Sequence, residues 1–203
     1  MSGLPLLAGF KSPSEAAQRC FRAVLGAVAE PGLAQTLERP LEAPEGCAWG
    51  TASLGLALLD SSTTFHVHGL AGLSGYLRFH TGAIEREAGA CQWAFVQASS
   101  ADLLGLAQSL SVGTLEYPEH SATLVIQLET PPKGPLGLQL RGPGIRDLRG
   151  LPDLGLSPPF WVWRQAARER YPLGIDLLFV HADQVWAIPR STELTLEAPC
   201  TSR

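Results

Sequence analysis

The sequence predicts an α/β domain built on a mixed β-sheet whose faces are covered by helices. Three observations lead to this expectation. Segments with helical periodicity alternate with short apolar runs in the first half of the chain, and apolar runs in the second half pair as hairpins. A chain of 203 residues with 45% hydrophobic content is long enough to bury a substantial core. We therefore expect one domain over residues 1–203.

The first helix is predicted from Pro13 to a stop at Pro31-Gly32. Ser12 is placed to cap it, Pro13 takes the first helical position, and Glu15 completes a Ser-x-x-Glu capping box. Apolar residues recur at helical spacing and form the expected core face: Ala17, Phe21, Val24, Leu25 and Val28.

The middle of the chain predicts alternating elements. A helix is expected over residues 51–59, a strand over 63–67 and a short helical turn over 73–77, which leads into Arg78-Phe79-His80-Thr81-Gly82. A strand over 92–97 and a helix from Ser100 to Leu110 follow. Strands over 123–128 and 136–140 are expected to be adjacent, joined by the Pro/Gly-rich turn 130–135.

The last third predicts a helix followed by a hairpin. Ser157-Pro158 opens the helix, which carries Trp161, Trp163 and a charged run over 164–170. It stops before Pro172, and two neighbouring strands follow, over 175–180 and from Val185 to Pro189. Asp176 starts the first strand, whereas Arg190, Ser191 and Thr192 leave the end of the second. The carboxylate of Asp176 and the loop that carries Arg190 therefore belong to one rigid hairpin.

Composition argues against nucleic-acid and membrane partners. The net charge is -4 and no block of Lys or Arg occurs, so the electrostatic term for nucleic-acid binding is missing. The longest apolar stretch, residues 48–59, is too short to span a bilayer, and the N-terminus lacks the charged region of a secretory signal. We expect a soluble, cytoplasmic protein. Its widely spaced cysteines are expected to be free thiols: Cys20, Cys47, Cys91 and Cys200.

His66 and His68 lie two residues apart on a predicted strand, so they share one face as metal-binding histidines sometimes do. No third ligand occurs nearby. We therefore favour a half-exposed polar face and expect no metal.

Arg78 and His80 are candidates for binding one anion, because an arginine and a titratable imidazole two residues apart can face the same ligand while Phe79 anchors the backbone in the core. The alternative is that His80 and Thr81 satisfy backbone groups at a turn ended by Gly82.

Arg190, with Ser191 and Thr192, is a candidate for binding a phosphate or phosphonate oxygen. The alternative is an ion pair of Arg190 with Asp176 or Glu30 that locks the hairpin to the first helix.

Trp161 and Trp163 cannot both face the same side of a helix. We expect one to fill the core and the other to meet a second surface, as in a subunit contact.

Several enzymatic signatures are absent from the sequence. It contains no phosphate-binding loop, no dinucleotide fingerprint, no nucleophile elbow and no His-Glu-x-x-His. Nothing in it predicts a catalytic residue.

Several segments together resemble the H subunit of the carbon-phosphorus lyase core complex, the bacterial machinery that breaks down organophosphonates. The strongest are Pro172-Leu-Gly-Ile-Asp176 and Ala187-Ile-Pro-Arg-Ser-Thr192. Upstream, in the same order, the resemblance includes residues 17–32, Leu77-Arg-Phe-His-Thr81, Gly113-Thr114 and Leu140-Arg-Gly-Pro-Gly-Ile145. Together these segments are distributed along nearly the whole chain, from residue 17 to residue 192.

The resemblance implies a reduced version of the fold of pyridoxal-phosphate-dependent transferases, without the cofactor site. That cofactor requires a lysine in a pocket, and neither Lys11 nor Lys133 lies at a suitable position, so we expect no cofactor. The resemblance also implies an accessory role, with G-, I- and L-type partners, in transferring the ribose triphosphate of ATP to a phosphonate. A J-type core partner and a homodimer in isolation are implied as well. The alternative is a stand-alone enzyme or binding protein, in which Arg78, His80 and Arg190 bind a small phosphonate or phosphorylated metabolite and His80 acts as acid or base.

Overall fold

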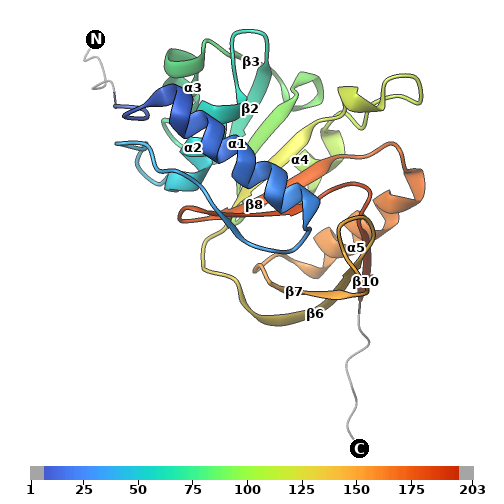
Figure 1. Cartoon of the computed structure of the whole chain (residues 1–203). Helices are drawn as coiled ribbons and strands as arrows, with labels where there is room; N and C mark the ends of the chain where they lie inside the picture. Colours follow the sequence, from blue (N-terminus) through green and yellow to red (C-terminus); the bar gives the residue numbers. More distant parts are fainter. Residues whose placement is uncertain (1–6, 197–203) are drawn as a thin grey trace, which may run out of the picture.

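The computed structural model describes residues 7–196, without the side chains of residues 135–137 and 196. A seven-stranded sheet forms its centre, in the order β1-β9-β8-β5-β4-β2-β3 (Figure 1). Neighbouring strands from β3 to β8 run parallel, whereas β9 pairs antiparallel with both β8 and β1. The strands are β1 (Gln35–Thr36), β2 (Thr64–His68), β3 (Ile84–Glu85), β4 (Trp93–Gln97), β5 (Thr123–Gln127), β8 (Asp176–His181) and β9 (Gln184–Ile188).

Five α-helices and a second sheet cover this one. The helices are α1 (Pro13–Ala29), α2 (Trp49–Leu58), α3 (Leu73–Thr81), α4 (Leu103–Ser109) and α5 (Pro158–Ala167). Short 3-10 helices are η1 (Ala88–Ala90), η2 (Pro118–His120) and η3 (Arg168–Arg170). The second sheet contains β6 (Lys133–Arg141), β7 (Arg149–Asp153) and β10 (Glu193–Leu196), in the antiparallel order β10-β6-β7. A mixed-sheet α/β fold is confirmed.

Each face of the seven-stranded sheet has its own hydrophobic core, because successive strand residues point to opposite sides. On β4, Phe95 packs in one cluster with residues of α1, α2 and α3. Its neighbours Ala94 and Val96 pack in the other, with residues of α4, α5 and the three-stranded sheet. The sheet therefore separates α1 from α5.

The first helix forms where the sequence predicts it, but with a different buried face. Phe21, Leu25 and Val28 are 49%, 52% and 40% exposed. The core face consists of the smaller residues Ala16, Cys20, Val24 and Ala27. The predicted capping box is also wrong, since the Ser12 side chain makes no capping hydrogen bond and only its carbonyl accepts one, from the backbone N–H of Ala16 (2.9 Å).

Two predictions about the middle of the chain are wrong. The helical turn from Leu73 continues through Thr81 as α3 and ends at Gly82, so Phe79 points away from the core and is 58% exposed, whereas Leu77 is buried. The strands β5 and β6 are not adjacent. β8 takes the place beside β5, and β6 leaves for the second sheet after Pro131-Pro132, which supplies no N–H donors for a hairpin.

The loop between β6 and β7 packs closely on the end of α1. A side chain at Gly144 (φ +78°) would collide with the carbonyl oxygen of Ala29, and one at Gly32 would lie 2.8 Å from Leu140. The Arg149 guanidinium donates a hydrogen bond to the Pro31 carbonyl at 2.7 Å. Two segments that carry the family resemblance, around Glu30-Pro-Gly and Arg-Gly-Pro-Gly, thus meet in space.

Cys20, Cys47 and Cys91 are free thiols, and Cys200 lies outside the described residues. No helix in the described part of the chain has the length and apolar character needed to cross a membrane.

Candidate functional site

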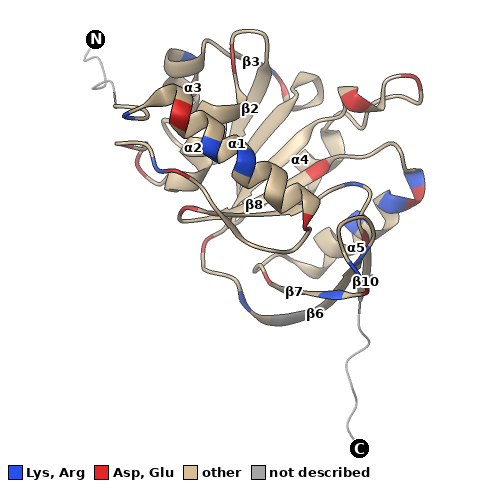
Figure 2. Cartoon of the chain, viewed as in Figure 1, with Lys and Arg blue, Asp and Glu red and all other residues tan. Residues whose placement is uncertain are grey.

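A cleft of about 360 Å³ opens between α4, α5 and the loops that flank the β8–β9 hairpin. Ile175 lies directly before β8 and Arg190 follows β9, so the cleft is at the amino ends of the parallel strands. Its charged lining residues are all arginines: Arg164, Arg170 and Arg190. Figure 2 shows basic segments along α5 and η3.

Asp176 and Arg190, two of the predicted site residues, join the open end of the β8–β9 hairpin. The backbone N–H of Arg190 donates to Asp176 Oδ1 at 2.8 Å, and Arg190 Nε lies 3.9 Å from Asp176 Oδ2. Arg190 Nη1 also donates to the Pro118 carbonyl at 2.6 Å, to the Gly174 carbonyl at 3.3 Å and to the Ser121 hydroxyl. Arg190 thus pairs with Asp176, as the architectural alternative expects, but the hydrogen bonds of its side chain go to Pro118, Ser121 and Gly174 and, among the described residues, not to the first helix.

Arg164 is the buried charge of the cleft, with a side chain that is 2% exposed. Its Nη2 donates to the Pro189 carbonyl at 2.7 Å and to the Thr192 carbonyl at 3.1 Å. Burial lowers the pKa of Arg164 to about 10, and the opposing effect of the Asp176 carboxylate does not offset it. The predicted site residue Thr192 is itself fully buried and does not line the cleft; its carbonyl supports Arg164.

The two tryptophans divide as predicted. Trp161 is 2% exposed, with its ring centroid 5.4 Å from that of Phe160 and 5.9 Å from that of Phe179. Trp163 is half-buried, lies 5.4 Å from Phe160 and contributes to the wall of the cleft. A subunit contact through Trp163 stays a prediction.

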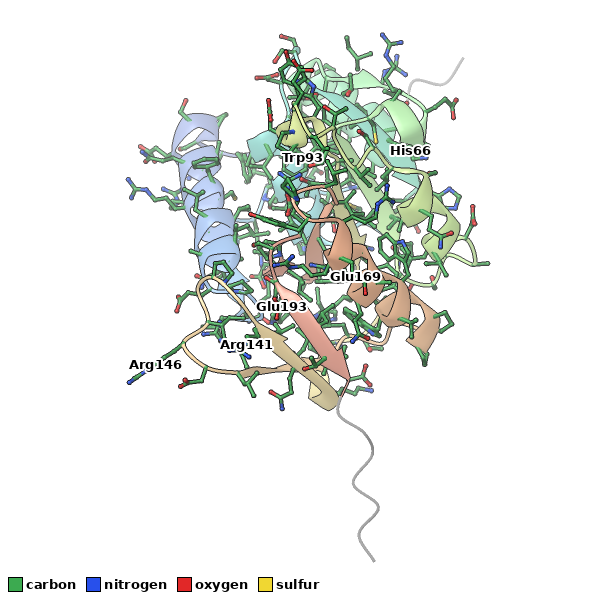
Figure 3. The ribbon with its side chains drawn as sticks, turned by 90° about the vertical axis from the view of Figure 1, so that its right-hand side faces the viewer. His66, Trp93, Arg141, Arg146, Glu169 and Glu193 are labelled. Atoms are coloured by element: carbon green, nitrogen blue, oxygen red, sulfur yellow. The ribbon has the colours of Figure 1, made fainter. Side chains whose placement is uncertain are left out.

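Arg78 and His80 do not face a common site, because residues two positions apart on a helix point to different sides. His80 Nε2 lies 2.9 Å from the Leu7 carbonyl, and its ring packs against Tyr76. Arg78 lines a separate, open hollow with His66 and Glu85. Figure 3 shows His66 at one end of the molecule and Arg141 and Arg146 at the other. The structure therefore contradicts a shared anion for Arg78 and His80 and agrees with the alternative, because His80 contacts the Leu7 carbonyl and the Thr81 hydroxyl donates to the Leu77 carbonyl at 2.8 Å, directly before Gly82.

The carboxyl ends of the parallel strands are filled by a polar network that sequence reasoning missed. Buried Gln127 accepts a hydrogen bond from the Ala48 N–H at 2.7 Å and donates to the Gly46 carbonyl and to Gln97, both at 2.8 Å. Gln97 in turn donates to Glu129 at 2.7 Å. Open parallel sheets usually bind ligands at this edge. Here Gln127 ties it to the start of α2 instead.

His66 Nδ1 lies 3.0 Å from the Arg86 carbonyl. Among residues 7–196, no group of three His, Cys, Asp or Glu side chains is arranged to hold a metal ion.

Arg164 and Arg170 were not predicted as site residues, because the sequence shows them only as parts of a charged run over residues 164–170. A usable signal was present for Arg164, since it follows Phe160 by four residues and so shares its buried helix face.

The fold and the cleft define a mixed-sheet α/β protein with an arginine-lined pocket at the amino edge of its sheet. The chain belongs to the PhnH family of bacterial phosphonate metabolism proteins, which it matches over residues 8–195. This confirms the family predicted from the sequence segments.

Two relatives are similar to the chain. The alpha-D-ribose 1-methylphosphonate 5-triphosphate synthase subunit PhnH of Rhizobium meliloti (strain 1021) is 32% identical over 197 residues, which cover 93% of this chain and 94% of that protein. The "Putative C-P lyase subunit protein HtxG" of Stutzerimonas stutzeri is 37% identical over 86 residues, which cover 42% of this chain and 44% of that protein.

Proposed function

We propose that this chain is the H-type subunit of a complex that transfers the ribose 5-triphosphate moiety of ATP to a phosphonate, within carbon-phosphorus lyase phosphonate breakdown. The observation that carries the proposal is the 32% identity to the Rhizobium meliloti synthase subunit over 93% of the chain. The proposed partners are the other core subunits, of the G, I and J types, with the L type as a further one. In isolation the chain is proposed to form a homodimer and to work in the cytoplasm.

Within this complex, we assign the chain an accessory role. The polar side chains lining the cleft are Trp163, Gln108 and three arginines. Arginines stay protonated near neutral pH, and neither an amide nor an indole exchanges protons there, so this set suits binding better than acid–base chemistry. The thiol pKa values of Cys20, Cys47 and Cys91 are raised by burial to about 11, 12 and 11, which keeps these thiols protonated and weakly nucleophilic.

We also propose that residues 1–203 form a single domain. Its fold is proposed to be a reduced version of the fold of pyridoxal-phosphate-dependent transferases. The residues present do not fit that cofactor in the cleft. Lys11 is exposed ahead of α1, Lys133 is exposed at the start of β6, and neither lines the cleft. A Schiff base requires a lysine amine in a pocket.

The exposed face of α1 supports a role in assembly. Phe21, Leu25 and Val28 lie at positions i, i+4 and i+7 of the helix and form an apolar α1 stripe on its outer side. Exposed apolar side chains gathered on one face are typical of protein contact surfaces.

Co-expression with the G-, I- and J-type subunits, followed by affinity purification through a tag on this chain, tests the proposal. We expect the wild-type chain to co-purify with them. The double substitution Phe21→Ser and Leu25→Ser should abolish co-purification without changing the circular dichroism spectrum. The matched control changes two exposed leucines elsewhere, Leu115→Ser and Leu148→Ser, which are 78% and 61% exposed, and should co-purify normally. A wild-type chain that purifies alone refutes membership of the complex, whereas a stripe variant that still co-purifies refutes only the role of α1.

A further inference from the structure

The Arg164 guanidinium is buried with unused hydrogen-bonding capacity. Only Nη2 has partners, both of them neutral carbonyls, and Nε has no acceptor among the described residues. None of the ion pairs of the described residues includes Arg164, and the charge of Asp176 only partly opposes the effect of burial on its pKa. A buried charged donor without an acceptor is among the more costly features of a protein interior, because it loses its water and gains nothing in return. The site is therefore short of a negatively charged acceptor.

The cleft adds further positive charge around Arg164. Arg170 is exposed at its rim, and its side chain has no hydrogen bond or ion pair among the described residues. Arg190 contributes a third guanidinium, which Asp176 balances only in part at 3.9 Å. Within residues 7–196, no acidic side chain lines the cleft. Three arginines that face one small volume attract an anion of more than one charge.

Apart from Gln108 and the arginines, the lining of the cleft is mostly apolar. Trp163 forms part of the wall, and Ala107 and Leu173 add aliphatic surface. A volume of about 360 Å³ lies at the lower end of the range for small-molecule sites. Such a volume suits a compact ligand with one anionic head and one apolar part.

We propose that this cleft binds a small organic oxyanion, a phosphonate or phosphate monoester, whose head group accepts hydrogen bonds from Arg164 and Arg170 and whose apolar substituent lies against Trp163. The inference goes beyond an accessory role, since it gives this chain a ligand of its own. It rests on the proposed function for the choice of phosphonate among oxyanions.

Calorimetric titration of the purified full-length chain tests the cleft with four probes: phenylphosphonate, methylphosphonate, inorganic phosphate and benzoate. We expect phenylphosphonate to bind most tightly, because it alone has both a dianionic head and a ring to pack on Trp163. Benzoate keeps the ring but has a single charge, and phosphate keeps the charge but has no apolar part. Rising salt concentration should weaken the binding of phenylphosphonate.

Two variants locate the binding. Arg170→Gln should lower the affinity for phenylphosphonate roughly tenfold, as expected for the loss of one charge-assisted hydrogen bond. The matched control is Arg22→Gln, because Arg22 is an exposed arginine on α1 whose side chain likewise has no partner among the described residues. Trp163→Phe should remove most of the change in tryptophan fluorescence that the ligand causes.

The results separate this inference from the proposed function. Absence of binding by the wild-type chain at millimolar probe, or equal losses in Arg170→Gln and Arg22→Gln, overturns the cleft assignment even if the chain co-purifies with its partners. Binding that Arg170→Gln weakens supports the assignment, even if co-purification fails. If Arg170→Gln leaves phenylphosphonate binding intact and instead abolishes co-purification, the cleft receives a partner's acidic side chain, and the small-molecule inference is refuted.

Discussion

Asp176 Oδ1 accepts a hydrogen bond from the backbone N–H of Arg190 at 2.8 Å, which joins the two ends of the β8–β9 hairpin beside the cleft. The ion pair between the two side chains is longer, at 3.9 Å, and both side chains are partly exposed, so it contributes little to stability. The backbone hydrogen bond is the stronger of the two links.

This relationship predicts different effects for two substitutions of Asp176. Asp176→Ala should lower the free energy of unfolding by about 1–2 kcal/mol, because it removes the acceptor. Asp176→Asn keeps an acceptor oxygen and should lose less than about 1 kcal/mol. Urea denaturation followed by circular dichroism measures both. Equal losses in the two variants would show that the charge, and not the acceptor, matters.

Gly144 and Gly155 form a matched pair for testing the contact between the β6–β7 loop and α1. Both have positive φ, +78° and +69°, but a side chain at Gly144 meets the Ala29 carbonyl, whereas one at Gly155 meets nothing within 4 Å. Gly155→Ala should cost about 1–2 kcal/mol of backbone strain. Gly144→Ala should cost a further 1–3 kcal/mol or so from the collision. Thermal unfolding of both variants gives the comparison, and similar melting temperatures would contradict the close contact.

The Gln127 network predicts a pH-dependent variant. In Gln127→Glu, an ionised carboxylate would face two acceptors, the Gly46 carbonyl and Gln97 Oε1, in a buried position. The pKa of the new carboxyl should rise, so its protonated form is tolerated at low pH and stability is lost as the pH rises through that pKa. Relative to wild type, the variant should be less stable at pH 8 than at pH 5 in urea denaturation. Gln127→Leu, which cannot ionise, should show the same deficit at both pH values.

Because the Cys20 and Cys91 thiols are buried, we expect them to be alkylated slowly in the folded protein. Burial raises the pKa of Cys20 and of Cys91 from 9.0 to about 11. At pH 8 their thiolate fraction, and hence their rate of reaction with iodoacetamide, should be roughly a hundredfold below that of the unfolded chain. Mass spectrometry of the peptides reads each cysteine separately, and the rates should converge in urea.

The raised pKa values of Cys20 and Cys91 also determine how the stability of the protein changes with pH. Because the folded state keeps these thiols protonated while the unfolded chain ionises above pH 9, their contribution is complete below pH 9 and is lost as the pH rises towards 11. A Cys20→Ala, Cys91→Ala double variant should show a smaller fall in its urea midpoint over this interval than wild type.

Local sequence signals predicted most of the elements correctly, where a single rule decided the outcome. Pro158 at the start of α5 and Pro31-Gly32 after the end of α1 are examples, and so is the apolar run of β8. The prediction of the buried helix face failed where tertiary packing decided it. The apolar pattern of α1 contains two faces, and only contact with the sheet selects Cys20 and Val24 over Phe21 and Leu25 for burial.

The candidate site was predictable only in part, because the sequence does not show which segments meet. Asp176 and Arg190 share a hairpin, so their proximity followed from local structure. Arg164 reaches the same place from the preceding helix α5, and its contacts with the Pro189 and Thr192 carbonyls depend on how that helix packs on the hairpin, which the sequence does not show. The pairing of Arg78 with His80 failed because side chains two residues apart share a face only in an extended segment, whereas this segment is helical.

The separation of α1 from α5 by the seven-stranded sheet has a consequence for how the chain operates within an assembly. A subunit seated on the α1 stripe covers one layer of the domain and leaves the layer with the cleft open to solvent. If a subunit binds the α1 stripe and a small molecule binds the cleft, as we propose, the ligand would enter and leave while the quaternary contacts stay intact. Substitutions in one layer would then change one of these two events and leave the other unchanged.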